Sequence, residues 1–278
     1  MTVCMAANET GQVAVTVRGP VPATEAQRAE GVIGRVLQNN RVDGVAWTRL
    51  TGPRYAGGPT VAQVDVSVHG LPVRAQADGP GSFALTLVAE RLDRQLRRIL
   101  SADHSRWWVD AGRRPLAYPG PTRPITRRKT CRLRLCHPAT AVAAMDAADY
   151  DAHLFTDRET GEDAIVYWAG PLGIRLARQR NRQAPRLSLP MLDAADSPAT
   201  PTHTERQAAI RLCRYGLPFL FYTDPYDGRG RLLYRRYDGD LALLIPSGSS
   251  APLSALSPAD APTYTLASTH RRGGGHDL

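Results

Sequence analysis

Four carboxylates around one predicted turn are the side chains that could form a metal site. They are Asp157, Glu159, Glu162 and Asp163, within the run FTDRETGEDAIVYW. Carboxylate oxygens are the usual ligands of hard cations such as Ca²⁺. Acidic side chains at hairpin turns are nevertheless far more often solvated. We therefore expect an ordinary turn and no metal site here.

The histidines and cysteines offer no clearer chemistry. His69 ends one predicted strand and His153 begins another, and neither has a second ligand at metal-binding spacing. The sequence also lacks the nucleotide-binding, zincin and hydrolase motifs GxxxxGKS/T, GxGxxG, HExxH and GxSxG. We expect a non-enzymatic binding protein without a cofactor. The cysteines match neither a zinc knuckle nor a CxxC redox site, and they are Cys4, Cys131, Cys136 and Cys213.

Arginines on two predicted helices are the best candidates for binding. In residues 80–100, apolar side chains line one helix face, and Arg91, Arg94 and Arg98 line another about 130° away. Arginines on a rigid helix face can contact the phosphates of structured RNA. Glu90 interrupts the patch, as does Asp93, so a solvated helix surface explains it equally well. The candidate RNA contacts on the helices are Arg28, Arg35, Arg91, Arg94, Arg97 and Arg98.

The net charge of +9 is concentrated in one band of the chain. Residues 111–140 hold eight basic and no acidic residues, whereas the flanking regions are close to neutral. The band predicts a polyanionic partner nearby, although a solvated linker also accounts for a charge run. With no apolar stretch of membrane-spanning length and no secretory signal in MTVCMAANETGQ, the 278 residues suit a cytoplasmic protein of about two domains.

Hydrophobic periodicity predicts an N-terminal α+β domain over residues 10–106. The element order is β-α-β-β-β-α, which places both helices on one face of a small sheet. The expected elements are strands at 12–19, 44–50, 60–70 and 71–77 and helices at 22–39 and 80–100.

A segment rich in proline and glycine, 107–124, predicts a linker after this domain. It begins with Trp107 and Trp108, which can stack on bases but more often complete a core at the end of an amphipathic helix. Two tandem small, mostly-β modules, each with a short helix, are expected beyond it. The expected ranges are a first module at 125–180, a second at 181–248 and a disordered tail at 249–278.

Local patterns predict several elements within the modules. Alternation of Cys131, Leu133 and Leu135 with arginines predicts a strand over 130–135, and RLSL at 186–189 is a further candidate. Thr204, with Gln207 three residues later, predicts a capped helix start. The remaining expected elements are a helix at 138–150, a hairpin at 153–168 and a second hairpin unit at 219–246.

The two modules repeat one another at an offset of 67 residues. Each unit, at roughly 55 residues, buries so small a fraction of its surface that it would be only marginally stable alone. We therefore expect each to pack against a partner. The aligned pairs are Met145 with Leu212, Phe155 with Tyr222, Thr156–Asp157 with Thr223–Asp224, Gly161 with Gly228 and Tyr167 with Tyr234, and a shift of two residues then aligns Gly170 with Gly239 and Leu172 with Leu241.

The second repeat, FLFYTDPYDGRGRLLYRRYDGDLALLIP, resembles the C-terminal domain of the long ribosome hibernation promoting factors. It has that family's Tyr-Arg-Arg at 234–236 and Asp-Gly at 238–239. The first repeat is similar but replaces these motifs with Tyr167-Trp168-Ala169 and Gly170-Pro171. The N-terminal element order, with VDVSVHG and AERLDRQLRR, resembles the family's ribosome-binding domain. A doubled C-terminal module is similar to the dormancy-associated, hypoxia-linked factors of mycobacterial type.

The resemblance implies a translation inhibitor that sits in the mRNA and tRNA channel of the small ribosomal subunit during stress or dormancy. It makes the helix arginines candidate rRNA contacts and adds Arg74 on the fourth strand. It also implies self-association through the C-terminal modules, with a second copy of the chain as a further partner. No membrane and no small-molecule substrate is expected. The candidate module-pairing residues are Phe155, Val166, Tyr167, Phe221, Leu233 and Tyr234.

Two modules in one chain can also pair with each other, because the covalent link holds them at an effective concentration around millimolar. This arrangement predicts inactive single ribosomes rather than ribosome dimers. A stress-induced RNA-binding or transcription-regulatory protein with another target is the alternative function.

Overall fold

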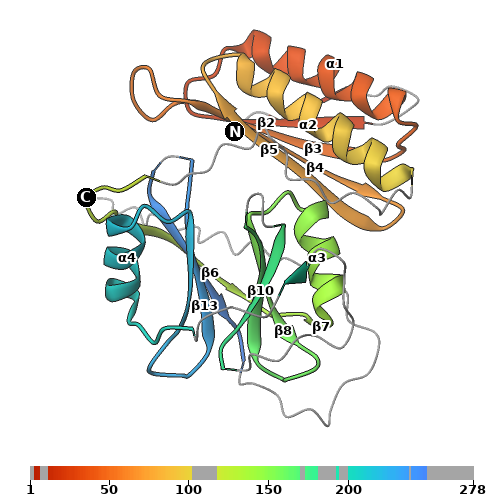
Figure 1. The fold of residues 1–278 in the computed structure, drawn as a ribbon. Helices are drawn as coiled ribbons and strands as arrows, with labels where there is room; N and C mark the ends of the chain where they lie inside the picture. Colours follow the sequence, from red (N-terminus) through yellow and green to blue (C-terminus); the bar gives the residue numbers. More distant parts are fainter. Residues whose placement is uncertain are drawn as a thin grey trace, which may run out of the picture.

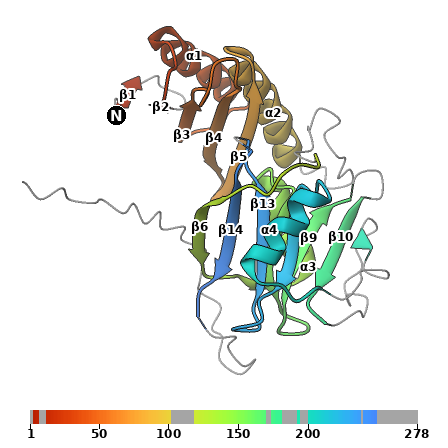
Figure 2. The same ribbon diagram turned by 90° about the vertical axis from the view of Figure 1, so that its left-hand side faces the viewer.

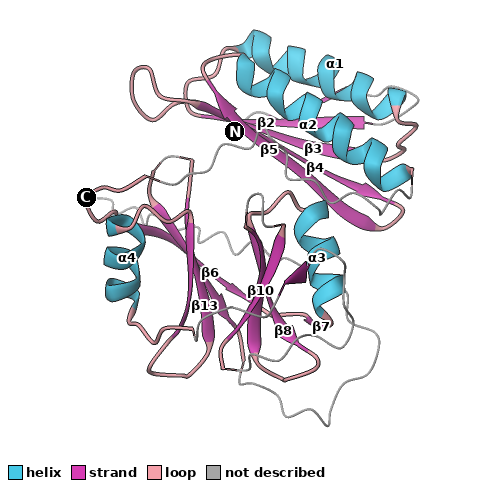
Figure 3. Ribbon diagram, viewed as in Figure 1, coloured by secondary structure: helices cyan, strands magenta, loops and turns pink. Residues whose placement is uncertain are grey.

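In the computed structural model of the chain, the described residues form an N-terminal α+β domain and two mostly-β modules (Figure 1, Figure 3). None of the helices among these residues has the length and apolar character needed to cross a membrane. The described residues are 3–6, 12–101, 118–169, 173–180, 192–193, 200–237 and 239–248. The expected linker before 118, Trp107 and Trp108, RLSL at 186–189 and the tail from 249 fall outside these ranges.

The N-terminal sheet has the strand order β1-β2-β3-β4-β5 and carries both helices on one face (Figure 1). β2 and β3 are parallel because helix α1 connects them as a crossover, and the other neighbours are antiparallel. The sequence does not predict β1, since four residues are too few to show alternation. The elements are β1 (Val3–Ala6), β2 (Gln12–Arg18), α1 (Ala23–Asn39), β3 (Val45–Thr51), β4 (Thr60–Val68), β5 (Leu71–Gly79) and α2 (Phe83–Leu100).

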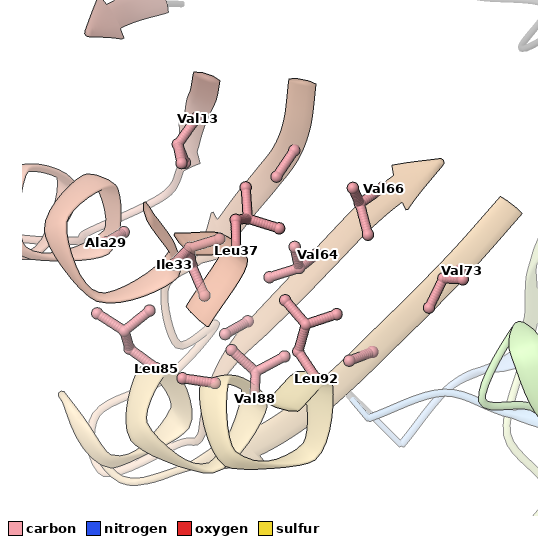
Figure 4. Close-up of a cluster of buried hydrophobic side chains, with 14 of the residues drawn as sticks. Val13, Ala29, Ile33, Leu37, Val64, Val66, Val73, Leu85, Val88 and Leu92 are labelled. Atoms are coloured by element: carbon pink, nitrogen blue, oxygen red, sulfur yellow. The ribbon is translucent and has the colours of Figure 1, made fainter. Parts of the chain in front are cut away.

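The N-terminal core lies between the helices and the sheet (Figure 4). Ile33 and Leu37 of α1 and Val88 and Leu92 of α2 are fully buried against Val64 of β4. Burying each such side chain contributes roughly 1.5–3 kcal/mol to the free energy of unfolding. The apolar stripe predicted for residues 80–100 is therefore the core-facing side of α2.

The two modules form a four-layer unit in which both sheets lie between the two helices (Figure 1). The first sheet has the order β11-β10-β9-β8-β7 and the second β12-β13-β14-β6. The first-module elements are β7 (Leu135–Cys136), α3 (Pro138–Ala147), β8 (Ala152–Asp157), β9 (Asp163–Trp168) and β10 (Ile174–Arg178). The remaining elements are β6 (Ile125–Cys131), β11 (Leu192–Asp193), α4 (Glu205–Arg214), β12 (Phe219–Thr223), β13 (Gly230–Arg235) and β14 (Leu241–Pro246).

Each module places its leading strand on the edge of the other module's sheet. β6 lies parallel to β14, with Ile125 opposite Leu241 (Figure 2). β11 lies parallel to β10, with Leu192 opposite Ile174. Leu192 is the repeat equivalent of Ile125, and Ile174 is the repeat equivalent of Leu241. The exchange of leading strands between the modules therefore follows the 67-residue repeat. The modules are therefore related by an approximate two-fold arrangement within one chain.

The strand predicted over 130–135 is wrong, because this segment connects the two sheets. β6 ends at Cys131, beside Pro246 of the second module, and β7 begins at Leu135, beside Thr156 of the first. An extended crossover shows the same alternation of exposed and covered side chains as a strand, so the pattern alone cannot separate them.

The offset of 67 holds through the third strand of each module, so the predicted two-residue shift does not apply there. Trp168 pairs with Ile174, and Arg235 pairs with Leu241 at the matching positions. Gly170 and Leu172, on which the shift depended, lie outside the described residues. The predicted start of α4 is confirmed, since Thr204 and Gln207 form a capping box.

Candidate binding surfaces

Four of the predicted RNA-contacting arginines lie exposed on the helix layer. Arg35 of α1 and Arg94 of α2 are both exposed. The Arg97 side chain is 70% exposed and pairs with Asp93 across one helical turn at 2.8 Å. Arg28 reaches from α1 to α2 and donates to the Thr86 hydroxyl at 3.0 Å. These four side chains form the helix-layer surface, defined as Arg28, Arg35, Arg94 and Arg97.

The other three predicted arginines face the first module instead. Arg91 pairs with Asp149 at 3.4 Å, and Arg98 pairs with Asp146 at 2.7 Å. Arg74 donates to the Tyr150 hydroxyl at 2.7 Å and also pairs with Asp65 on the neighbouring strand β4. The structure therefore divides the predicted set into an exposed group and a group that binds module one.

The end of α3 caps the edge of the N-terminal sheet. The Gln95 side-chain amide donates to the backbone carbonyls of Asp146 and Ala147 at 2.8 and 2.7 Å. Asp149 accepts from the backbone N–H of Gln76 at 3.1 Å. Since β5 is an edge strand, this bond satisfies a backbone donor that has no neighbouring strand. Module one is thus docked to the N-terminal domain by polar contacts.

Two of the carboxylates singled out in the sequence, Asp157 and Glu159, are held by one arginine. Asp157 accepts from Arg178 Nε at 2.6 Å, and Glu159 accepts from the same guanidinium at 3.0 Å. The Arg178 side chain is only 2% exposed and that of Asp157 is fully buried. Within the described part of the chain, no three His, Cys, Asp or Glu side chains gather at a site that could hold a metal ion.

An apolar cluster joins the inner faces of the two module sheets. We call it the module seam, and its best-buried members are Leu154 and Ile165 of module one and Phe221 and Leu232 of module two. The ring of Tyr167 meets that of Phe219 edge-on at 5.4 Å between centroids. Most seam residues occur as pairs 67 positions apart: Leu154 and Phe221, Ile165 and Leu232, Ala152 and Phe219, and Ala177 and Leu244.

Only some of the predicted pairing residues lie in this seam. Tyr167 and Phe221 belong to it. Phe155 and Val166 face α3 in the core of module one, and Leu233 faces α4 in the core of module two. These three residues alternate along their strands with residues of the module seam. Both faces of each of these strands are apolar in sequence, one toward the helix and one toward the other module. Tyr234 lies under the ammonium group of Lys129, which is 5.6 Å from its ring centroid.

A buried ion pair joins the two modules at a place where nearly equivalent positions of the two repeats meet. Asp163 of module one accepts from Arg229 of module two at 2.7 and 3.1 Å, and from the Gly230 N–H at 2.9 Å. Gly230 is the repeat equivalent of Asp163. A Cβ atom on Gly230 would lie 2.7 Å from the Asp163 Cβ and 2.8 Å from the Phe221 ring. This position therefore requires glycine in one copy and accepts aspartate in the other.

Sequence reasoning missed the residues that hold the modules and domains together. A signal for the ion pair does exist, because Glu162-Asp163 in copy one aligns with Arg229-Gly230 in copy two. Such an exchange of acidic for basic residues between repeats is expected where two copies meet. The missed residues are Asp146, Asp149, Arg229 and Gly230, whereas Asp163 was considered only as a metal ligand and its role in pairing was missed.

Comparison with known proteins agrees with this architecture. The family described as "Sigma 54 modulation/S30EA ribosomal protein C terminus" matches residues 121–176. Two curated relatives, both called "Dormancy associated translation inhibitor", come from two strains of Mycobacterium tuberculosis. Each is 46% identical to this chain over 249 residues, which cover 87% of this chain and 91% of the relative. The chain therefore belongs to the dormancy associated translation inhibitors, within the family of long ribosome hibernation promoting factors.

Proposed function

We propose that this protein is a ribosome hibernation factor that inhibits translation by binding the small ribosomal subunit in the mRNA and tRNA channel. The names of its relatives support translation inhibition, and the matched family supports a ribosomal target. The helix-layer surface offers four arginines on a rigid scaffold, which suits contacts with rRNA phosphates. Its action requires binding and not turnover.

The tandem modules pair within the chain, in this proposal, and the factor holds single ribosomes. The observation that carries this step is the module seam, in which equivalent residues of the two copies pack face to face. A homodimer would bury the same surfaces between two chains, as an isologous interface does. Because the covalent link supplies an effective concentration around millimolar, a second chain seldom displaces the internal partner.

The ion pair at Asp163 and Arg229 adds specificity to that pairing. Two copies of module one facing each other would bring Asp163 against Asp163, which is a repulsive contact between buried charges. Two copies of module two would bring Arg229 against a glycine with no carboxylate to accept from it. Pairing of module one with module two is therefore favoured over pairing of two identical modules.

Ribosome co-sedimentation of the full chain tests the proposed site. Replacing Arg35, Arg94 and Arg97 with glutamine should weaken ribosome binding at least tenfold and flatten its salt dependence. A matched control removes three exposed arginines from α4: Arg206, Arg211 and Arg214. Equal binding by both variants would contradict the helix-layer site. Binding to naked RNA without binding to ribosomes would favour the alternative RNA-binding function.

A further inference from the structure

The face of the N-terminal sheet that the helices leave uncovered carries basic side chains close to strand β6 (Figure 2), since the charge of Arg127 acts on Arg49 and that of Arg74 acts on Lys129. Arg49 of β3 and Arg74 of β5 alternate with core residues and so point away from α1 and α2. Arg127 and Lys129 alternate with exposed residues on β6 and lie on its half-buried side. Together with Arg18 and Arg236, these side chains form the basic seam: Arg18, Arg49, Arg74, Arg127, Lys129 and Arg236.

Most of this charge has no counter-charge in the part of the chain that the structure describes. Among the described residues, Arg18, Arg49, Arg127 and Lys129 form no ion pair. The nearest carboxylate, Asp65, is bonded to Arg74 and to the Gln63 side chain. The buried Nε of Arg49 has no hydrogen-bond partner. A buried donor without a protein partner costs about 1–3 kcal/mol, and an anion beside Arg49 would offset that cost.

The basic groups also repel one another across the domain boundary. Burial, followed by the charges of Arg127, Arg74 and Arg236, lowers the pKa of Lys129 to about 8. Burial lowers the pKa of Arg49, and Arg18, Arg74 and Arg127 lower it further against the attraction of Asp65. Charges gathered in this way oppose folding, and an anion between them would remove the repulsion.

An exposed tryptophan lies on the same face as the basic seam. Trp47 is 58% exposed, and its strand position is opposite Asp65, which is in turn opposite Arg74. A large apolar ring left in water beside arginines is the usual arrangement for stacking a base next to its phosphate. The Trp47 side chain belongs neither to the N-terminal core nor to the helix-layer surface.

We propose that the basic seam between the N-terminal sheet and β6 is a phosphate-binding site, which takes the backbone of a single-stranded RNA with a base stacked on Trp47. The same phosphate chemistry can come from a free phosphate compound, and the test separates the two sources. The site lies on the opposite side of the sheet from the helix-layer surface. It is therefore additional to the proposed contacts with rRNA and does not depend on them.

The test uses the full chain, a labelled single-stranded RNA of eight nucleotides followed by anisotropy, and inorganic pyrophosphate as competitor. The double variant Arg49→Gln/Arg127→Gln should weaken RNA binding at least tenfold and reduce the salt slope by about 1.4, as expected for two lost phosphate contacts. The control variant Arg206→Gln/Arg211→Gln removes the same charge from α4 and should bind as wild type. Trp47→Leu should weaken RNA binding about tenfold and leave pyrophosphate binding unchanged.

Three outcomes decide the proposal. Loss of both RNA and pyrophosphate binding supports the site with RNA as its ligand. Loss of pyrophosphate binding alone supports the site with a free phosphate compound as its ligand. Unchanged binding of both, or an equal loss in the α4 control, overturns it.

The unfolding midpoint separates a binding role from a structural one. Because the seam charges repel one another, Arg49→Gln/Arg127→Gln should be as stable as wild type or more stable. If that variant unfolds more easily, Arg18→Gln/Arg127→Gln repeats the test, since the Arg18 side chain is exposed. Ribosome co-sedimentation of wild type keeps the two proposals distinct. Failure of wild type to bind ribosomes contradicts the proposed function. Failure of Arg49→Gln/Arg127→Gln to differ from the α4 control in RNA and pyrophosphate binding contradicts only the phosphate site.

Discussion

Asp163 of the first module accepts two bonds from Arg229 of the second, although the repeat aligns Arg229 with Glu162 and Asp163 with Gly230. The two copies have thus become complementary at the place where a symmetric pair would bring equivalent residues together. Both side chains are nearly buried, at 3% exposure for Asp163 and 12% for Arg229. The contact joins two unlike modules of one chain.

Removing one partner of this ion pair should destabilise the module pair. Asp163→Asn leaves the Arg229 guanidinium buried without its counter-charge, which should cost about 3 kcal/mol in the free energy of unfolding. Urea unfolding of the full chain measures this. Arg128→Gln is the matched control, because its bond to Glu205 lies on the surface and should contribute no more than about 1 kcal/mol. Equal losses in the two variants would contradict a special role for the buried pair.

Gly230 should tolerate no side chain. Gly230→Ala places a Cβ atom 2.7 Å from the Asp163 Cβ and 2.8 Å from the Phe221 ring, so the modules must move apart. We expect a loss of about 1–3 kcal/mol in thermal or urea unfolding. Gly120→Ala is the control, since nothing lies within 4 Å of its added Cβ. Unchanged stability of Gly230→Ala would show that the modules do not approach this closely in solution.

The docking of α3 on the N-terminal sheet should depend on Asp149. Asp149→Ala removes the acceptor for the Gln76 N–H and the partner of Arg91. The β5 edge should then exchange its amide hydrogens at least tenfold faster, as followed by mass spectrometry. Glu90→Ala, on the exposed side of α2, removes an equal charge and should leave exchange at this edge unchanged. Slow exchange in Asp149→Ala would contradict the docked arrangement.

His153 should make the first module sensitive to acid. Burial, with a smaller effect of Arg134, lowers the pKa of His153 to about 4, and Tyr150 stacks on its ring. An unfolded histidine titrates near 6.5, so below that pH the unfolded chain binds a proton that the folded chain excludes. Stability should fall by up to about 1.4 kcal/mol per pH unit between about 6.5 and 4 and then level off.

Comparison with His153→Gln isolates this contribution. The difference in unfolding free energy between the variant and wild type should be constant above pH 7 and should shift in favour of the variant as the pH falls to 4. A difference that does not change with pH would show that His153 titrates normally in the folded chain.

Local patterns account for most of the secondary structure but for little of the pairing. The stripe on α2 and the cap at Thr204 were predictable because each depends on residues within a few positions of each other. The placement of β6 on β14 was not, because that parallel pairing joins segments more than 100 residues apart. Nor could alternation decide whether Leu232 or Leu233 faces the module seam, since both are apolar.

The arginines illustrate the same limit for binding sites. Arg91 and Arg94 belong to one predicted basic face, yet Arg91 is held by Asp149 and Arg94 is exposed. The partner of Arg91 is 58 residues away, in a module whose position no helical period reports. A charge pattern therefore indicates where a surface can bind but not which side chains the fold has already used.

Sedimentation of ribosomes with the purified full-length factor in a sucrose gradient tests the central claim most directly. If the two modules pair within one chain, the factor should sediment with single ribosomes at every ratio of factor to ribosome. Asp163→Arg, which weakens the internal pair, should be the variant that begins to form dimers. A gradient in which wild-type factor produces mainly ribosome dimers would contradict the internal pairing.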